Sequence, residues 1–215
     1  MGKMLKIKRT LLYTIGRPLD WLLFHTVFPF RVVNANALRG REAPYLLIAN
    51  HRHALDPALL GMLCPYEIRF LGKEELVRSR AARWLLSKLH MIPIARHESD
   101  LNAIRTCITT LREGNVLTIF PEGTRHQEKL MGTVEKGTAL LALREKVDMI
   151  PVYIDGIMKP FRLNRAIVGD PILASDYPAG GYNSRNAEIL CSRIRDSFYA
   201  LRDRLKGDSV DRTRR

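Results

Sequence analysis

Short apolar runs alternate with amphipathic stretches along most of the chain. Runs with the length and composition of buried strands occupy residues 45–50, 67–72, 91–95, 115–120 and 149–154. Helical spacing of the apolar positions predicts helices over residues 57–63, 78–90, 99–114, 135–146 and 183–206. Strands that alternate with helices predict an α/β fold, with a mixed, largely parallel sheet flanked by helices.

The N-terminal segment, residues 1–30, has a pattern of its own. Its apolar run at residues 19–30 is too short to span a membrane, and Arg17, Asp20 and Arg31 interrupt every longer candidate. Basic residues are interleaved with apolar ones before that run: Lys3, Lys6, Lys8, Arg9 and Arg17. This pattern predicts an amphipathic helical segment that associates with an anionic membrane.

The same segment has two other interpretations. The first is a basic helix that only docks on the domain. The second is a secretory signal peptide, which is disfavoured because no small-residue cleavage site follows the apolar run. In the membrane interpretation, Trp21, Phe24 and Phe28 lie at the level of the lipid headgroups. The chain then divides into residues 1–30 and a domain over residues 31–215, on the cytoplasmic face of a membrane as a peripheral or monotopic protein.

The charge of the chain restricts its partners. It has 35 Lys and Arg against 22 Asp and Glu, a formal net charge of +13 at pH 7. Such a positive charge predicts an acidic partner: nucleic acid, anionic lipid or a phosphorylated substrate. Because the sequence has no recognisable nucleic-acid-binding motif, nucleic acid is not the expected partner. Cys64, Cys107 and Cys191 are odd in number and lack metal-ligand spacing, which indicates reduced thiols.

Two histidines and an aspartate follow the first buried run, in the stretch IANHRHALDP at residues 48–57. On one helix, five steps of about 100° would turn His51 and Asp56 roughly 140° apart. We therefore expect His51 in a turn after the strand and Asp56 as the N-cap of a helix that begins at Pro57. A carboxylate that orients an imidazole forms a general base. The alternatives are a capping Asp beside surface histidines and a metal site that includes His53.

Another polar stretch, IFPEGTRHQ at residues 119–127, follows a second buried run. Gly123 and Thr124 can present backbone N–H groups, and the guanidinium of Arg125 can bind a phosphate through two hydrogen bonds. Glu122 can hold a guanidinium or bind a substrate hydroxyl. The alternative is an ordinary turn with solvated charges.

Further cations follow two more predicted strands, because Lys73 ends one and Arg96 follows the other. In α/β sheets, sites form beyond the carboxyl ends of the strands. The histidine, the carboxylates and the cations are therefore expected to converge on an anionic substrate.

These stretches resemble the motifs of a known enzyme family. NHRHALD with FPEGTR is similar to the paired signature of the glycerolipid acyltransferases, especially the lysophosphatidic acid (1-acylglycerol-3-phosphate) acyltransferases. LGKEELVRSRAARWLLSKLHMIPIAR resembles the family's middle blocks, and MIPVYIDG resembles its closing block. The resemblance runs from about residue 32 to 156, with the blocks in the family's order. His53 is a departure, since the family more often has Ser there.

The resemblance implies transfer of a fatty acyl group from coenzyme A or acyl carrier protein to a glycerol hydroxyl in phospholipid synthesis. It implies that His51 removes the hydroxyl proton and that Asp56 holds the required tautomer. The implied acceptor is a phosphorylated glycerolipid, bound by a pocket to which these residues contribute: Lys73, Arg96, Glu122, Gly123, Thr124 and Arg125. No cofactor or metal is implied beyond the thioester co-substrate.

Two alternatives stay open from the sequence. Another acceptor, such as glycerol 3-phosphate, a different lysophospholipid or a lipid-linked sugar, would fit the same motifs. A non-catalytic basic module that binds membranes or nucleic acid would explain the charge. It would not explain why all four motif side chains are present together: His51, Asp56, Glu122 and Arg125.

Overall fold

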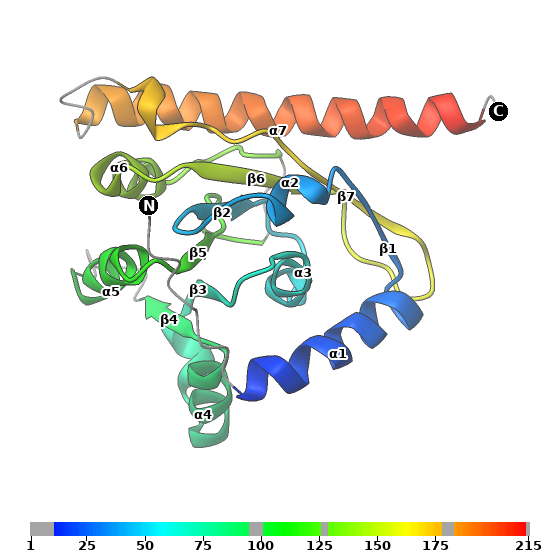
Figure 1. The fold of residues 1–215 in the computed structure, drawn as a ribbon, viewed down its shortest axis with the longest axis horizontal. Helices are drawn as coiled ribbons and strands as arrows, with labels where there is room; N and C mark the ends of the chain where they lie inside the picture. Colours follow the sequence, from blue (N-terminus) through cyan, green and yellow to red (C-terminus); the bar gives the residue numbers. More distant parts are fainter. Residues whose placement is uncertain (1–10, 95–100, 126–128, 178–182, 214–215) are drawn as a thin grey trace.

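A computed structural model describes residues 11–94, 101–125, 129–177 and 183–213, which fold around one central sheet (Figure 1). The sheet has seven strands in the described part of the chain: β1 Phe30–Val33, β2 Leu46–Ala49, β3 Ile68–Lys73, β4 Met91–Ile94, β5 Val116–Ile119, β6 Met149–Ile154 and β7 Asn164–Val168. Their order is β1-β7-β6-β2-β5-β3-β4.

The sheet is mixed and largely parallel, which confirms the predicted fold class. β6, β2, β5, β3 and β4 are parallel neighbours, whereas β7 pairs antiparallel with β6 and parallel with β1. The carboxyl ends of the five parallel strands therefore lie along one edge. This is the edge at which an α/β sheet forms its sites.

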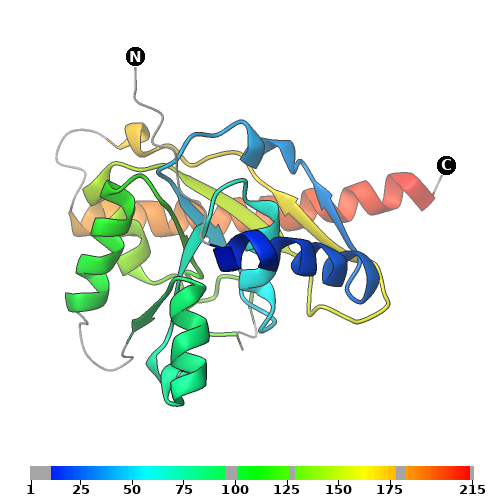
Figure 2. The same ribbon diagram turned by 60° about the horizontal axis from the view of Figure 1, so that its bottom comes forward.

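Helices cover both faces of the sheet. Their bounds are α1 Leu11–Thr26, α2 Asn36–Arg39, α3 Asp56–Leu63, α4 Arg80–Lys88, α5 Leu101–Arg112, α6 Lys136–Glu145 and α7 Ser184–Thr213, with 3-10 turns η1 Glu74–Val77 and η2 Ala174–Asp176. One face packs against α5, α6 and α7, and the other packs against α1, α2 and α3. Figure 2 brings α1 and α4 to the front, on the side opposite to α7.

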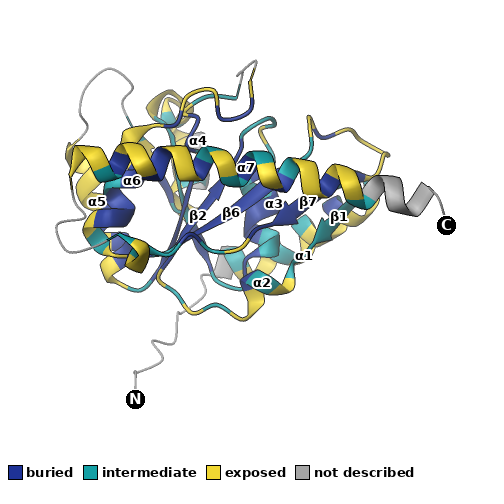
Figure 3. Cartoon of the chain, turned by 90° about the horizontal axis from the view of Figure 1, so that it is seen from above, coloured by how far each residue is buried: buried dark blue, intermediate teal, exposed yellow. Residues whose placement is uncertain are grey.

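The period of two along the strands divides the core between these faces. In β2, Leu46 and Ile48 pack toward the α5–α7 side, whereas Leu47 and Ala49 pack toward α2 and α3. All four side chains are buried, as expected for a central strand covered on both sides. Figure 3 shows buried β2 and β6 beneath α7, whose own surface alternates between buried and exposed.

Several boundaries differ from the sequence prediction. β1 and β7 were not predicted, and the last helix continues to Thr213, beyond the predicted end at residue 206. The predicted start of the helix at residues 99–114 lies outside the described residues. Its end agrees with the prediction, because α5 stops at Arg112 and Gly114 has φ +80°, which favours glycine.

The described part of the N-terminal segment docks on the domain. α1 packs against α3, and the Tyr13 hydroxyl lies 2.9 Å from the carbonyl oxygen of Gly61. The Arg17 guanidinium donates to the carbonyl oxygen of Met62 over 3.0 Å. Phe24 is 1% exposed in a core cluster, so its predicted place among lipid headgroups is wrong. Docking and membrane contact are compatible, and the membrane role stays a prediction.

Candidate active site

The loop from β2 to α3 is fixed at its first residue, Asn50. Its side-chain amide donates to the carbonyl oxygen of Ile154 over 2.9 Å, and its side-chain oxygen accepts the Ile154 N–H over 2.7 Å. Asn50 is buried, so this two-fold contact ties the loop to the end of β6 in a water-poor setting. This role was not predicted from the sequence, although a polar residue directly after a buried run is a signal for it.

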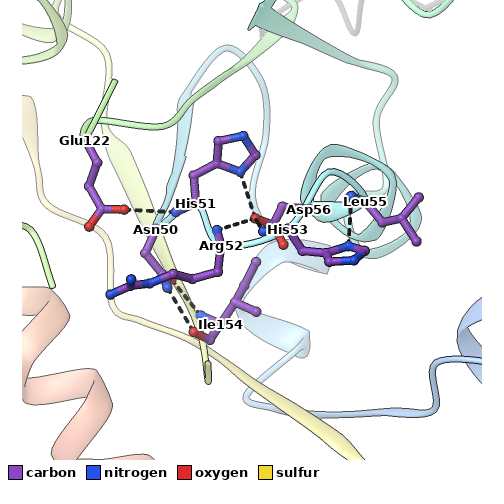
Figure 4. Close-up of polar contacts among 8 residues, drawn as sticks. All are labelled: Asn50, His51, Arg52, His53, Leu55, Asp56, Glu122 and Ile154. Carbon is purple, nitrogen blue, oxygen red and sulfur yellow. Dashed lines mark hydrogen bonds and ion pairs between the residues drawn. The ribbon is translucent and has the colours of Figure 1, made fainter. Parts of the chain in front are cut away.

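His51 and Asp56 meet beyond the end of β2, as expected from the sequence. The imidazole Nδ1 lies 2.7 Å from Asp56 Oδ2 (Figure 4). The same oxygen accepts the backbone N–H groups of Arg52 over 2.7 Å and His53 over 2.8 Å. The turn at residues 51–55 thus curls around one carboxylate oxygen. Because an ionised carboxylate only accepts hydrogen bonds, this arrangement requires a proton on Nδ1.

The predicted capping role of Asp56 is wrong. The N-cap of α3 is Leu55, and no side chain caps the first turn. Asp56 is the first helical residue, 0% exposed, and its Oδ2 is directed back to the preceding turn. Its charge still benefits from the positive end of the helix dipole. Oδ1 is buried and has no hydrogen-bond partner among the described residues.

The imidazole of His51 is held on two sides. Its ring stacks on Phe120 with centroids 4.0 Å apart and an interplanar angle of 21°. Asp56 holds Nδ1, so Nε2 is the nitrogen left to face a substrate. The side chain is 18% exposed, which leaves the ring accessible but restrained. A histidine held in this way can accept a proton at a defined point.

Glu122 connects the second motif to the first through the backbone. Its Oε2 accepts the N–H of His51 over 3.0 Å, and its Oε1 accepts the N–H of Met131 over 2.9 Å. The residue is 2% exposed. These contacts give Glu122 a positioning role for His51 that the sequence analysis did not anticipate. Direct binding of substrate by Glu122 stays a prediction.

The other predicted site residues lie at the same edge where the structure describes them. Lys73 ends β3, and Thr124 and Arg125 follow β5 with their side chains partly exposed. Gly123 has φ +65°, and its N–H donates to the carbonyl oxygen of Phe120 over 3.0 Å, so this amide is engaged in the turn. Arg96 lies outside the described residues, and its role stays a prediction.

His53 is directed away from the pair formed by His51 and Asp56 (Figure 4). Its Nδ1 accepts the N–H of Leu55 over 3.2 Å, and its ring lies 5.8 Å from that of Phe28. The described part of the chain contains no group of three or more His, Cys, Asp or Glu side chains placed to hold a metal ion. The His51–Asp56 pair has the geometry of a general base with an orienting carboxylate, and Lys73 and Arg125 follow strands that end at the same edge.

Comparison with known proteins assigns these residues to a family. The family described as "Acyltransferase" matches residues 29–155, more than half of the chain. A 1-acyl-sn-glycerol-3-phosphate acyltransferase of Bacillus subtilis is 26% identical over 165 residues, which cover 72% of this chain and 81% of that protein. A lyso-ornithine lipid O-acyltransferase of Pseudomonas aeruginosa is 35% identical over 128 residues, covering 59% of this chain and 48% of that protein.

A solved structure has the same fold. The crystal structure of the 1-acyl-sn-glycerophosphate acyltransferase of Thermotoga maritima aligns with a TM-score of 0.64. The alignment covers 88% of this chain and 78% of that chain, at 21% sequence identity. At this identity, the likeness supports the α/β architecture alone.

Proposed function

The chain belongs to the acyltransferase family, and we propose that it is an O-acyltransferase of the 1-acylglycerol-3-phosphate type. It transfers a fatty acyl group from a thioester to the free hydroxyl of a glycerol-phosphate lipid. The observation that carries this proposal is the 2.7 Å contact between His51 Nδ1 and a fully buried Asp56, which leaves Nε2 as the base. The family match over residues 29–155 includes both motifs of the site.

In the proposed mechanism, Nε2 of His51 takes the proton of the acceptor hydroxyl as its oxygen attacks the thioester carbonyl carbon. Asp56 stabilises the imidazolium that forms. When the carbon–sulfur bond breaks, the imidazolium returns a proton to the departing thiolate. The products are an oxygen ester and a free thiol. The leaving group is a thiolate of low basicity, so the step proceeds without metal or redox chemistry.

Cations at the β5 and β3 side of His51 suit the phosphate of the acceptor. We assign this role to Arg125 and Lys73, together with Arg96, which lies outside the described residues. Glu122 holds the backbone of His51, and Gly123 and Thr124 shape the turn that carries Arg125. A guanidinium matches phosphate through two parallel hydrogen bonds, which a lysine cannot make.

A second acceptor is favoured by one observation. The Pseudomonas protein with 35% identity is named for a lyso-ornithine lipid. The same base and thioester chemistry would serve that acceptor, and only the contacts to its headgroup would differ. We keep 1-acylglycerol-3-phosphate as the first candidate, because the site edge carries Lys73 and Arg125 for a phosphate.

The purified protein tests the proposal in an acyl-transfer assay. Acyl-CoA and acyl carrier protein donors are each combined with 1-acylglycerol-3-phosphate, glycerol 3-phosphate, another lysophospholipid and lyso-ornithine lipid. We expect the highest kcat/KM with 1-acylglycerol-3-phosphate. A preference for lyso-ornithine lipid would select the second candidate, and an absence of transfer in every combination would contradict the proposal.

Conservative substitution of the cations should separate acceptor binding from chemistry. We expect Arg125→Lys, and separately Arg96→Lys, to raise the acceptor KM by roughly tenfold, because one charge-assisted hydrogen bond to phosphate is lost. The donor KM should change little. Both Michaelis constants are measured in the same assay. A defect confined to the thioester would assign these residues to the donor instead.

Contact with an anionic membrane follows from the substrate, since the acceptor and product are lipids. Among the described residues, no helix combines the length and apolar character needed to cross a bilayer. α1 nevertheless exposes a stripe of apolar side chains, spaced about one helical turn apart. They are Ile15, Leu19 and Leu22, each 52–63% exposed. The exposed Phe161 adjoins its end, where its N–H donates to the Val27 carbonyl oxygen over 2.6 Å. We propose that this surface lies in the headgroup layer of the cytoplasmic face.

Leu19→Ser with Leu22→Ser should weaken binding to anionic vesicles by about tenfold or more, because both side chains lose apolar contact with lipid. Vesicle flotation at low and high salt measures the change and separates apolar from electrostatic attraction. These substitutions are preferable to deleting residues 1–30, which would remove Phe24 from the core. The matched control is Ile189→Ser, an exposed site on α7, across the sheet from α1. Equal binding by all variants would place membrane attachment elsewhere.

A further inference from the structure

A pocket of about 300 Å³ opens on the far side of the His51 loop from Arg125 and Lys73. Its polar lining comes from three elements: Asn50 and Arg52 of the β2–α3 loop, Tyr153 and Asp155 at the end of β6, and Arg202 and Lys206 of α7. Its volume is at the lower end of the roughly 300–1,000 Å³ found for ligand sites. Asn50 ties the loop to β6 and the backbone N–H of Arg52 donates to Asp56, whereas the Arg52 side chain and the other four residues have no role in the site described above.

The pocket is positively charged. Three cations, Arg52, Arg202 and Lys206, face one carboxylate, Asp155, and that carboxylate already pairs with Arg165. Arg202 and Lys206 are one helical turn apart on α7, and each directly follows a buried leucine, Leu201 or Leu205, so the fold directs both toward the same space.

Arg202 contacts two other side chains of α7 through its guanidinium. Its guanidinium lies 4.7 Å from the centroid of the Tyr199 ring and 2.8 Å from an oxygen of Asp203. The Asp203 side chain is 63% exposed, and an exposed ion pair of this kind contributes little and can yield to a better-placed anion.

Tyr153 adds a neutral hydroxyl to this lining. Burial, together with the adjacent Asp155, raises the pKa of its phenol to about 12, so the group remains protonated. Its O–H donates to Asp155 over 3.3 Å. The pocket therefore combines cationic side chains from the β2–α3 loop and α7 with polar groups at the end of β6.

The strand order sets the position of this pocket relative to the base. β2 lies between β6 and β5 in the sheet. The residues that follow β2 therefore lie between those that follow β6 and those that follow β5. Lys73 and Arg125 follow β3 and β5 on one flank, and the pocket follows β6 on the other. In Figure 4 the Arg52 side chain extends away from the His51 ring, past Asn50 and toward the β6 side. The two sets of cations thus flank the base.

We propose that the pocket formed by Arg52, Arg202 and Lys206 is a second phosphate subsite, which holds the phosphate of the pantetheine arm of the thioester donor. This inference rests on the proposed function, in which both substrates carry phosphate and must meet at His51. Two phosphates repel each other, so two cationic sites on opposite flanks of the base bring the hydroxyl and thioester together more readily than one shared site. The other possible source of phosphate is the acceptor.

The test is the double variant Arg202→Gln/Lys206→Gln, which removes two charges from the surface of α7 without touching its buried side. We expect the KM for acyl-CoA or acyl carrier protein to rise roughly tenfold while the acceptor KM stays within about twofold. An acyl-N-acetylcysteamine thioester lacks phosphate. In the double variant, the ratio of kcat/KM for the full donor to kcat/KM for this truncated donor should fall by a similar factor. Arg204→Gln is the matched control, because Arg204 is an exposed arginine on α7 outside the pocket lining.

The outcomes are distinct. A rise confined to the acceptor KM would show that the pocket binds the phosphate of the acceptor, and it would overturn the assignment to the donor. Unchanged constants for both substrates, or an equal effect of Arg204→Gln, would overturn the inference. Calorimetric titration with free CoA and with holo acyl carrier protein gives a readout that does not depend on turnover. Weaker binding of these probes by the double variant alone would support the subsite even if no acyl transfer were found, whereas unchanged binding by an active enzyme would overturn the subsite alone.

Discussion

Replacing His51 with alanine is expected to lower the rate of acyl transfer by about 10²–10⁴-fold, the contribution of a positioned general base. The side chain is partly exposed and contacts Phe120 and Asp56, so its removal leaves the sheet and its cores intact. The rate is measured at saturating concentrations of both substrates, and circular dichroism with thermal unfolding confirms that the variant is folded.

His53→Ala is the matched control for this variant. It removes the neighbouring imidazole, whose Nδ1 accepts the N–H of Leu55 and whose ring is directed toward Phe28. We expect the acyl-transfer rate of His53→Ala to stay within about tenfold of that of the original protein, because His53 transfers no proton in the proposed mechanism. Near-normal turnover of His51→Ala would disprove the mechanism. A large defect in His53→Ala alone would mean that the other imidazole is the base.

Asp56→Asn should lower the rate by about 10²–10³-fold, mainly by removing the charge that stabilises the imidazolium. The tautomer of His51 with its proton on Nδ1 should be retained. The amide oxygen of the new side chain is favoured at the Oδ2 position, because Arg52 and His53 donate two backbone N–H groups there. Its NH₂ group then occupies the buried position of Oδ1, which has no partner among the described residues. We therefore expect a loss of roughly 1–3 kcal/mol in the free energy of unfolding.

The double variant His51→Ala/Asp56→Asn tests whether the two side chains act as a unit. If Asp56 acts through the imidazole, its replacement should cost little further rate once His51 is gone. The loss of stability from Asp56→Asn should remain, since the amide donors of the turn are still present. Equal rate losses in both backgrounds would contradict the proposed role of Asp56.

The two sequence motifs form one structural unit. Phe120 supplies the surface on which the imidazole stacks, and Glu122 accepts the backbone N–H of the same residue, His51. β2 and β5 are paired, so their ends bring the two motifs together although many residues separate them in the chain. His51 is thus held at three points: its ring, its Nδ1 and its backbone N–H.

Local pattern was sufficient for the central strands and for the pair at the end of β2. β2, β5 and β6 are short apolar runs whose residues are buried on both faces, which makes their signal independent of the partner strands. The spacing of His51 and Asp56 argued against a shared helix, and Pro57 indicated the start of α3 to within one residue, since the helix begins at Asp56. Those inferences depend only on near neighbours in the chain.

What only the tertiary structure decided depends on residues far apart in the sequence. β1 is an edge strand and β7 is its inner neighbour. Arg31 and Arg165 interrupt their apolar pattern, and the two strands form through pairing with partners far along the chain, β1 with β7 and β7 also with β6. α1 presents Phe24 to the core and Leu19 to solvent, because α3 covers only one side of it. The cations of α7 reach the end of β6 only through the packing of that helix across the sheet. Sequence periodicity reports which side chains share a face of an element, whereas the element that covers that face is determined by the fold.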